Sequence, residues 1–300
     1  MTVPAAPQAE GMPSSSPASA VPAVRLREVT RDYRRQRTSM FTPAPVVRAL
    51  RGVSLDIAQG QRFGIVGESG CGKSTLLRII AGLDQPTTGS VEIDGTDISR
   101  LPERRLGFLR ERLQLVFQDP MGSLDPRMKV RDIIAEPLVS QGKRDNLPRV
   151  LELLEAVGLQ SEAADRYPHQ FSGGQRQRIS IARALAPDPR ILVADEPVSA
   201  LDVSVRAQVL NLLDELVERL SLTLIFVSHD LSVIRHVCDS VAVMTRGEVV
   251  EVGATEQIYQ QAEHAYTRAL IAAAPRLRTA LAGRTAADLA ADTLAAKETS

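Results

Sequence analysis

Short runs of apolar residues, either continuous or alternating with polar ones, recur along the chain and predict β-strands. The run VRLREV opens the body of the chain at Val24, and the continuous run RFGIV at 62–66 leads into a glycine-rich turn. Further runs of this kind lie at 53–57, 90–95, 113–117, 191–195, 222–227, 240–245 and 248–252.

Helical spacing of apolar residues occupies the segments between these runs. A helix is predicted to begin at Lys73, with Gly82 near its end as a C-cap. The stretch at about 120–186 has helical spacing and no strand pattern, which predicts an all-helical insert. A later helix has an apolar stripe made of Val205, Val209, Leu212, Leu216 and Leu220. Strands that alternate with helices predict an α/β fold with a mostly parallel sheet.

The two ends of the chain differ in composition from this body, which we place at 24–275. Residues 1–23 are mostly Pro, Ala and Ser, and such a segment buries too little apolar surface to offset its ordering entropy. We therefore expect a disordered tail there, and an Ala-rich tail at 276–300. A basic stretch from Arg34 to Pro45 predicts an extended loop. No apolar run reaches the roughly 18 residues of a membrane helix, and the first residues lack the pattern of a secretory signal.

Composition narrows the possible functions. The 300 residues include 36 Lys+Arg and 36 Asp+Glu, so the formal net charge is zero, and aromatic residues make up 3% with no Trp. Both values disfavour a protein that binds nucleic acid through phosphates or base stacking. The two cysteines, Cys71 and Cys238, are too few for a disulfide framework or a four-thiolate metal site.

The turn after the strand at 62–66 matches the phosphate-binding pattern G-x-x-x-x-G-K-[ST]. Its glycines let backbone N–H groups point inward, and the following helix presents a partial positive charge to the phosphates. The pattern assigns Lys73 to the β- and γ-phosphates and the Ser74 hydroxyl to Mg²⁺. The predicted ATP-binding residues here are Gly67, Glu68, Ser69, Gly70, Cys71, Gly72, Lys73, Ser74 and Thr75.

Two adjacent acids, Asp195 and Glu196, end the apolar strand at 191–195. A buried strand tip is a poor place for two carboxylates unless they bind something. In P-loop nucleotide hydrolases the first acid at this position holds Mg²⁺. Successive strand residues point to opposite sides, so Glu196 is free to orient an attacking water instead. A pair of solvated acids at a strand end is the alternative.

Further motifs resemble those of ABC (ATP-binding cassette) ATPases. Phe171 to Arg178 (FSGGQRQR) resembles the family's signature motif and lies just before the Asp195 strand. Gln118 resembles the Q-loop glutamine, Ser199 to Asp202 the D-loop, and His229 the switch histidine. Tyr33 lies where the family has an adenine-stacking aromatic residue. The resemblance covers about 24–275 and implies a P-loop core with an N-terminal antiparallel β portion.

The resemblance also implies roles for these residues. Glu196, His229 and Gln118 are the expected catalytic residues, and Ser74, Gln118 and Asp195 the expected Mg²⁺ ligands. In this family two cassettes stack head to tail, so each signature motif closes over the ATP of the other. The residues expected to act on the partner's ATP are Ser172, Gly173, Gly174, Gln175 and Asp202. The second cassette is either another copy of this chain or a paralogue.

A narrower resemblance connects the chain with the cassettes of oligopeptide, dipeptide and nickel importers. It rests on the segments Phe117 to Arg127 and His264 to Leu270. Asp125 and Ala265 depart from the usual Asn and Pro of that subfamily. Some of those cassettes carry a C-terminal iron–sulfur centre, and with no cysteine after Cys238 we expect none here.

The resemblance implies a peripheral subunit at the cytoplasmic face of the cell membrane that energises uptake of peptide-type solutes. Its expected partners are two transmembrane permease subunits and, indirectly, a solute-binding protein. The helical insert, with Met121, Leu124 and Met128, is expected to contact the permease. Three alternatives stay open: a soluble ABC ATPase acting on nucleic acid or ribosomes, a nucleotide-controlled binding module, and an importer cassette for another solute such as nickel.

Overall fold

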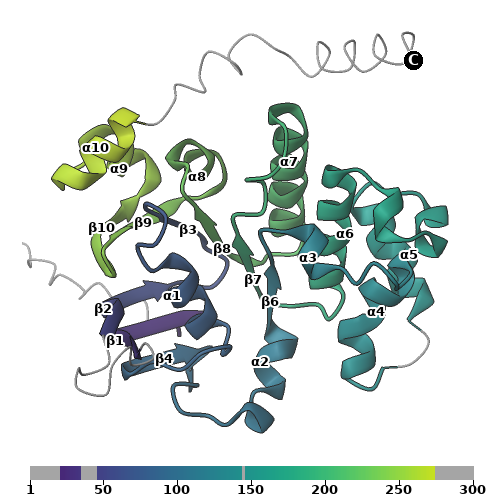
Figure 1. Cartoon of the computed structure of the whole chain (residues 1–300), viewed down its shortest axis with the longest axis horizontal. Helices are drawn as coiled ribbons and strands as arrows, with labels where there is room; N and C mark the ends of the chain where they lie inside the picture. The colour runs from purple at the N-terminus through teal and green to yellow at the C-terminus, as the bar shows by residue number, and fades with distance from the viewer. Residues whose placement is uncertain (1–20, 35–45, 144–145, 274–300) are drawn as a thin grey trace, which may run out of the picture.

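Two β-sheets organise the chain in the computed structural model, which describes residues 21–34, 46–143 and 146–273 (Figure 1). The smaller sheet is antiparallel, with strand order β2-β1-β4-β5. Its strands are β1 Val24–Arg34, β2 Val46–Ile57, β4 Thr88–Ile93 and β5 Thr96–Asp97.

The larger sheet has six strands in the order β10-β9-β3-β8-β7-β6. All neighbours from β9 to β6 are parallel, and only β10 runs antiparallel to β9. The strands are β3 Arg62–Val66, β6 Leu113–Val116, β7 Ile191–Asp195, β8 Thr223–Ser228, β9 Ser240–Thr245 and β10 Glu248–Ala254. Continuous apolar sequences form the central strands because a parallel sheet is covered on both faces.

Alternate residues of β7 and β8 enter two different hydrophobic cores. Ile191 and Ile225 belong to the core that includes helix α1 (Lys73–Ile80) and the antiparallel sheet. Leu192 and Phe226 belong to the core on the opposite face, which includes α7 (Val203–Arg219) and α8 (Leu231–Val237). The large sheet is therefore the middle layer, and its strand ends are held rigidly from both sides.

The segment between β6 and β7 contains only helices within its described residues, and it lies at the end of the molecule away from the antiparallel sheet (Figure 1). Arg183 ties this insert together by donating from Nη1 to the carbonyl oxygen of Ser123 at 2.5 Å. The helices are α3 Pro120–Ser123, α4 Val130–Ser140, α5 Leu147–Ala156, η2 Ser161–Asp165, η3 Pro168–Gln170 and α6 Gly173–Leu185.

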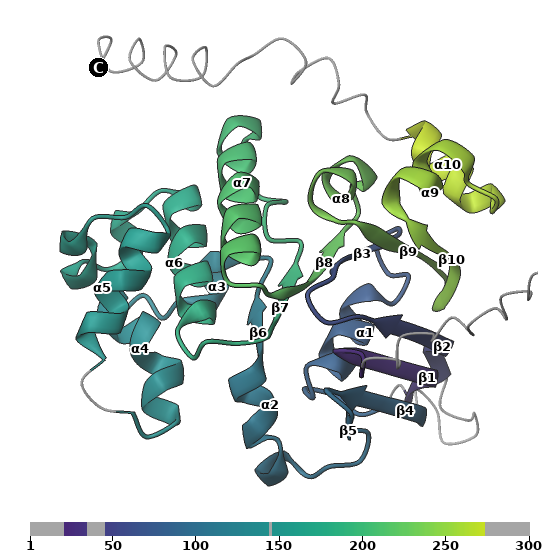
Figure 2. The ribbon, with the colours of Figure 1, turned by 180° about the vertical axis from the view of Figure 1, so that it is seen from behind.

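Four short helices complete the described part of the fold: η1 Glu103–Arg105, α2 Gly107–Arg112, α9 Thr255–Gln261 and α10 Ala265–Ala273. The last two lie beside β9 and β10, as both views show (Figure 2). The predicted α/β class, with its mostly parallel sheet, antiparallel N-terminal portion and helical insert, is confirmed. Gly82 has φ +67° just after α1, which suits its predicted capping position.

Several sequence expectations differ from the structure. The first strand continues to Arg34, because a bulge at Glu28 (φ +48°) lets β1 keep pairing with β2 as far as Arg34 and Val46. Leu220 lies beyond the end of α7 and is 42% exposed, so it is not part of a buried stripe. Ala23 is already fully buried, and the rest of the predicted tails, 1–20 and 276–300, lies outside the described residues, as does the predicted loop at 35–45.

Candidate active site

The predicted catalytic residues meet at one edge of the large sheet. Parallel strands present their carboxyl ends at the same edge, and ligands in open α/β sheets bind there. The phosphate-binding turn follows β3, whose last residue Val66 pairs with Ser228 of β8. Asp195 ends β7 opposite Val227, and His229 comes directly after β8. Gln118 follows β6, the next strand along.

The phosphate-binding turn is packed tightly against its surroundings. A Cβ on Gly67 would lie 2.2 Å from the carbonyl oxygen of Met244, and a Cβ on Gly72 would lie 2.6 Å from that of Ala49. Gly72 also has φ +110°, a conformation that favours glycine, and it begins α1. From the far side Gly247 donates its N–H to the carbonyl oxygen of Cys71 at 2.8 Å. The shape of the turn is therefore fixed by close backbone contacts.

Lys73 places its ammonium group inside this turn. Its Nζ donates to the carbonyl oxygens of Gly67 at 2.6 Å and Glu68 at 3.0 Å, and the residue is 5% exposed. Cys71 lies alongside, with Sγ 4.0 Å from Nζ, and burial raises the pKa of this thiol. A buried ammonium group needs oxygen partners. The loop supplies them here, and phosphate oxygens would replace them when nucleotide binds.

Glu196 is the centre of a hydrogen-bonded group formed by three strand ends. Its Oε2 lies 3.0 Å from Nδ1 of His229 and accepts a longer bond, 3.4 Å, from Nε2 of Gln118. The Glu196 backbone is left-handed, with φ +45°, and its N–H is held by the carbonyl oxygen of Val227 at 3.0 Å. Such a conformation is costly for a residue with a side chain, and it is found preferentially at functional sites.

Asp195 is the inner member of the acid pair. Burial and the neighbouring Glu196 raise the pKa of its carboxyl group, and the charge of Lys73 opposes that rise. Negative charge therefore accumulates at this strand tip, where a cation would relieve it. Within the described ranges no three His, Cys, Asp or Glu side chains form a metal-binding cluster. The Asp195 carboxylate, the Ser74 hydroxyl and the Gln118 amide oxygen are hard oxygen ligands. Together with phosphate oxygens, such ligands suit Mg²⁺.

The phosphate turn after β3, the buried lysine and the pair of acids at the end of β7 define a P-loop nucleotide hydrolase. The sequence-predicted residues Lys73, Asp195, Glu196, His229 and Gln118 come together at the same sheet edge.

The signature residues lie elsewhere, at the start of α6. Ser172 caps this helix by accepting from the N–H of Gln175 at 3.3 Å, while Gln175 Oε1 accepts from the N–H of Ser172 at 3.0 Å. A Cβ on Gly174 would lie 2.3 Å from Val205 of α7, so this glycine permits close packing of the two helices. β8, β7 and β6 separate α6 from α1 in the ribbon (Figure 1).

The D-loop lies against this signature segment. The side chain of Leu201 approaches to 3.4 Å of a Cβ built on Gly173. Asp202 is exposed and begins α7 without a side-chain capping bond. Ser172 and Asp202 are both exposed and Gly173 is half-buried, whereas Gly174 is buried against α7.

Tyr33 lies near the end of β1 rather than in an irregular loop. Its hydroxyl donates to Asp84 Oδ2 at 2.7 Å, and the guanidinium carbon of Arg31 lies 4.6 Å from the ring centroid. Arg31 also forms an ion pair with Asp84 at 2.7 Å. One ring face is therefore occupied by Arg31, and only the opposite face is left for a stacking partner.

One contact of the phosphate turn had no local signal in the sequence. The N–H of Glu68 donates to the hydroxyl of Tyr266 at 3.0 Å, although 198 residues separate the two. Tyr266 lies within the segment that resembles peptide importers, but nothing in its neighbourhood along the chain points to residue 68.

Comparisons with known proteins agree with this class. A family model described as ABC transporter matches residues 50–199. The dipeptide transport ATP-binding protein DppF of Escherichia coli (strain K12) is 50% identical over 241 residues, covering 79% of this chain and 72% of that protein. The oligopeptide transport ATP-binding protein OppD of Mycobacterium tuberculosis is 51% identical over 256 residues, which is 84% of this chain but 42% of that protein.

Solved structures show the same likeness. The dimeric cassette MJ0796, in a post-hydrolysis state bound to ADP and Pi, matches with a TM-score of 0.68 and 34% identity over 77% of this chain and 98% of that one. The chain belongs to the ABC transporter family, and it is an ATP-hydrolysing cassette. The family resemblance expected from the sequence is confirmed.

The packing of Gly67 yields a direct test of the phosphate turn. Gly67→Ala forces a methyl group against the Met244 carbonyl oxygen, so the turn must shift. We expect ATP to bind about 10- to 100-fold more weakly, as measured by fluorescent-nucleotide titration. Gly107→Ala is the matched control, because nothing lies within 4 Å of a Cβ there. Equal affinity of the two variants would show that this turn does not hold the nucleotide.

Proposed function

We propose that this cassette hydrolyses ATP to energise the uptake of peptides through separate permease subunits. The hydrogen-bonded group of Glu196, His229 and Gln118, at the edge that carries the phosphate turn, is the observation that supports hydrolysis. The relatives DppF and OppD, named as dipeptide and oligopeptide transport proteins, support peptides as the solute class. The segments 117–127 and 264–270 resemble segments of peptide importers, which also supports peptides as the solute class.

ATP is proposed to lie over residues 67–75, with its adenine on the free face of Tyr33. Lys73 exchanges its bonds with the Gly67 and Glu68 carbonyl oxygens for bonds with the β- and γ-phosphates. Because the lysine is already buried and positioned, little reorganisation is needed. The N-terminus of α1 adds a favourable dipole for the phosphates.

Ser74, Gln118 and Asp195 are the proposed Mg²⁺ ligands. Ser74 is exposed at the start of α1, and Gln118 has its amide nitrogen directed to Glu196, which leaves the amide oxygen for the cation. When bound, Mg²⁺ neutralises charge on the β- and γ-phosphate oxygens. Asp195 contributes the negative charge that balances the cation at the strand tip.

Glu196 is proposed as the general base. Its carboxylate accepts a hydrogen bond from the attacking water and polarises it toward the γ-phosphate. His229 has Nδ1 beside Glu196, so Nε2 is the nitrogen left for the γ-phosphate and the water. Positioning and electrostatics supply nearly all the catalysis in phosphoryl transfer, so the fixed Glu196 backbone is part of the mechanism.

A second cassette is proposed to complete each ATP site. Ser172, Gly173, Gly174 and Gln175 form the start of α6, where Ser172 and Gln175 are exposed. With Asp202 beside them, these residues fit the γ-phosphate side of an ATP bound to another copy or to a paralogue. A helix N-terminus of this kind binds anions through free N–H groups and the dipole.

The permease is proposed to dock beside the start of the helical insert. A groove of about 290 Å³ lies there, lined by residues that include Gln114, Phe117, Glu136 and Arg183. Phe117, which lines the groove, is 41% exposed, and Met121, in the following helix α3, is 53% exposed. Leu124 is 2% exposed and packs in the core, so the expectation that it contacts a permease is wrong. Met128 is partly buried against that core.

The chain's location follows from this docking. In the portion the structure describes, no helix has the length and apolar character needed to cross a bilayer. We propose a peripheral position at the cytoplasmic face of the cell membrane, held by the permease subunits. A solute-binding protein would act on the other side of the membrane through those subunits.

Glu196→Gln tests the general base. The amide keeps the shape of the side chain but cannot take a proton, so we expect turnover to fall about 10²- to 10⁴-fold while ATP affinity changes little. Phosphate release at saturating ATP, together with nucleotide titration, measures both quantities. Glu218→Gln on the exposed face of α7 is the control, since its side chain is 79% exposed. Hydrolysis by Glu196→Gln at the rate of the control variant would remove Glu196 from this role.

Met121→Cys tests the docking surface. The native thiols Cys71 and Cys238 are both buried, so a thiol-directed crosslinker reacts mainly at the introduced site. We expect a covalent product with a co-expressed permease in membranes from Met121→Cys and from Phe117→Cys. Val252→Cys on β10 is similarly exposed, at 50%, and should give none. If neither Met121→Cys nor Phe117→Cys yields the product, or if Val252→Cys yields as much, the permease binds elsewhere.

A further inference from the structure

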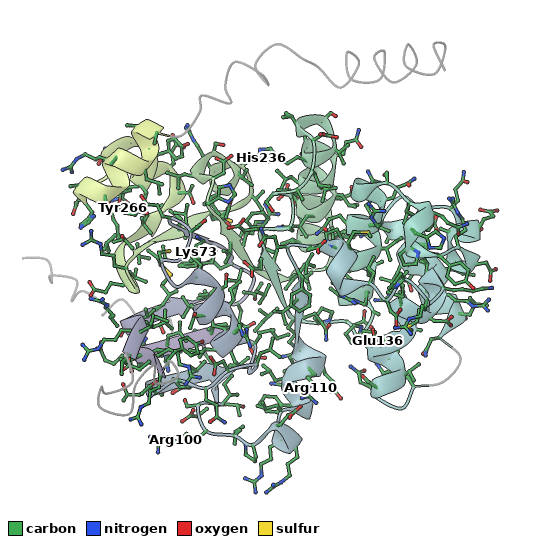
Figure 3. The ribbon with its side chains drawn as sticks, in the orientation of Figure 1. Lys73, Arg100, Arg110, Glu136, His236 and Tyr266 are labelled. Atoms are coloured by element: carbon green, nitrogen blue, oxygen red, sulfur yellow. The ribbon has the colours of Figure 1, made fainter. Side chains whose placement is uncertain are left out.

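Helix α10, the last helix among the described residues, contacts the phosphate turn. Tyr266, in its first turn, accepts a hydrogen bond at 3.0 Å from the N–H of Glu68. Tyr266 lies outside the turn, and its side chain bonds to the turn's backbone, whereas the bonds from Lys73 come from within the turn. Figure 3 labels Tyr266, which comes from α10, and Lys73, which begins α1.

The bond fixes the peptide that also holds the lysine. The Gly67–Glu68 peptide donates its N–H to Tyr266 at 3.0 Å, and its carbonyl oxygen, that of Gly67, accepts from Lys73 Nζ at 2.6 Å. An amide engaged by a phenol is not available to a phosphate. Glu68 was expected among the ATP-binding residues, and this geometry gives its backbone N–H a structural partner instead.

Tyr266 is itself held firmly. Its own N–H donates to His264 Nδ1 at 3.2 Å, and the side chain of Glu251 on β10 accepts from the N–H groups of Glu263 and His264. The Tyr266 ring packs against the hydrophobic core, along with Leu270 and Ile271. The start of α10 is thus anchored to β10, and a hydroxyl on this anchor has a defined position.

The Tyr266 hydroxyl is suited to accept a hydrogen bond at physiological pH. Burial raises the pKa of Tyr266, so the group stays neutral at physiological pH. A neutral phenol oxygen accepts from the Glu68 N–H, and the Thr245 side chain is a further hydrogen-bond partner at the end of β9. Phenylalanine would keep the ring and lose the hydroxyl, and with it the bonds to Glu68 and Thr245.

We infer that Tyr266 is a positioning residue that holds the Glu68 peptide and so preorganises the phosphate turn for nucleotide. It acts through the backbone of the turn. The inference rests on the proposed binding of ATP over residues 67–75. Since linkage is reciprocal, bound nucleotide should in turn stabilise the start of α10.

Tyr266→Phe is the primary test, with Tyr259→Phe as its matched control. Tyr259 lies on α9, where its ring stacks with Arg235 at 4.5 Å, and it loses the same atom in the same part of the fold. We expect the ATP dissociation constant and KM of Tyr266→Phe to rise about three- to ten-fold, as loss of one hydrogen bond allows, with kcat nearly unchanged. Tyr259→Phe should match the unmodified chain in all three.

Hydrogen exchange gives a direct readout of the turn. Peptides that cover 67–72 should exchange faster in nucleotide-free Tyr266→Phe than in the unmodified chain, and the difference should vanish at saturating ATP. Peptides at 264–268 of the unmodified chain should be protected when ATP is added. Unchanged exchange at 67–72 in Tyr266→Phe would overturn the inference, whatever its melting temperature.

Glu68→Pro completes a double-mutant cycle with Tyr266→Phe. It removes the donor, the N–H of residue 68, rather than the acceptor, the Tyr266 hydroxyl. In that background Tyr266→Phe should have no further effect on ATP affinity. A three- to ten-fold loss that persists there would mean that Tyr266 acts by another route. If the unmodified chain and Tyr259→Phe bind ATP normally while Tyr266→Phe equals them, only this inference fails. If none of them binds ATP, the proposed function fails.

Discussion

A buried ammonium group is the point around which the phosphate turn is built. Lys73 is 5% exposed and bonds to two carbonyl oxygens of its own loop, so the loop must close around it before any nucleotide arrives. Leaving a charge of this kind unpaired would be strongly unfavourable. The close contacts of Gly67 and Gly72 and the bond from Gly247 to Cys71 hold the surrounding backbone in that shape. Phosphate then needs only to replace oxygen partners that are already in place.

The parallel sheet supplies the second constraint. Four neighbouring strands end at one edge, and each delivers a polar group there because its core-facing residues are fixed by two hydrophobic layers. Glu196, His229 and Gln118 come from three of these strands and meet within hydrogen-bonding distance. The helical insert begins just beyond Gln118, so the proposed metal and γ-phosphate site lies a short distance along the chain from the groove proposed for the permease.

Much of this site could be predicted from the sequence, because strand and helix patterns are local signals. Parallel strands then bring the residues at their carboxyl ends to one edge of the sheet. Asp195 ends a recognisable strand, His229 directly follows another, and Lys73 lies in the turn after a third. The errors come from nonlocal packing. A left-handed Glu28 extends β1 through Tyr33, and no residue preference marks such a bulge. Leu124 is drawn into the core by its neighbours in the insert, and Tyr266 meets Glu68 across 198 residues.

The central claim is that one ATP is held between the turn at Lys73 of one cassette and the helix start at Ser172 of another. Analytical ultracentrifugation of the Glu196→Gln variant measures this most directly, with the chain alone and mixed with a paralogous cassette. The account predicts a dimer in one of these samples at saturating ATP, and monomers when Ser172→Arg is added to the variant. Monomers in both samples at saturating ATP, or a dimer that Ser172→Arg leaves intact, would contradict it.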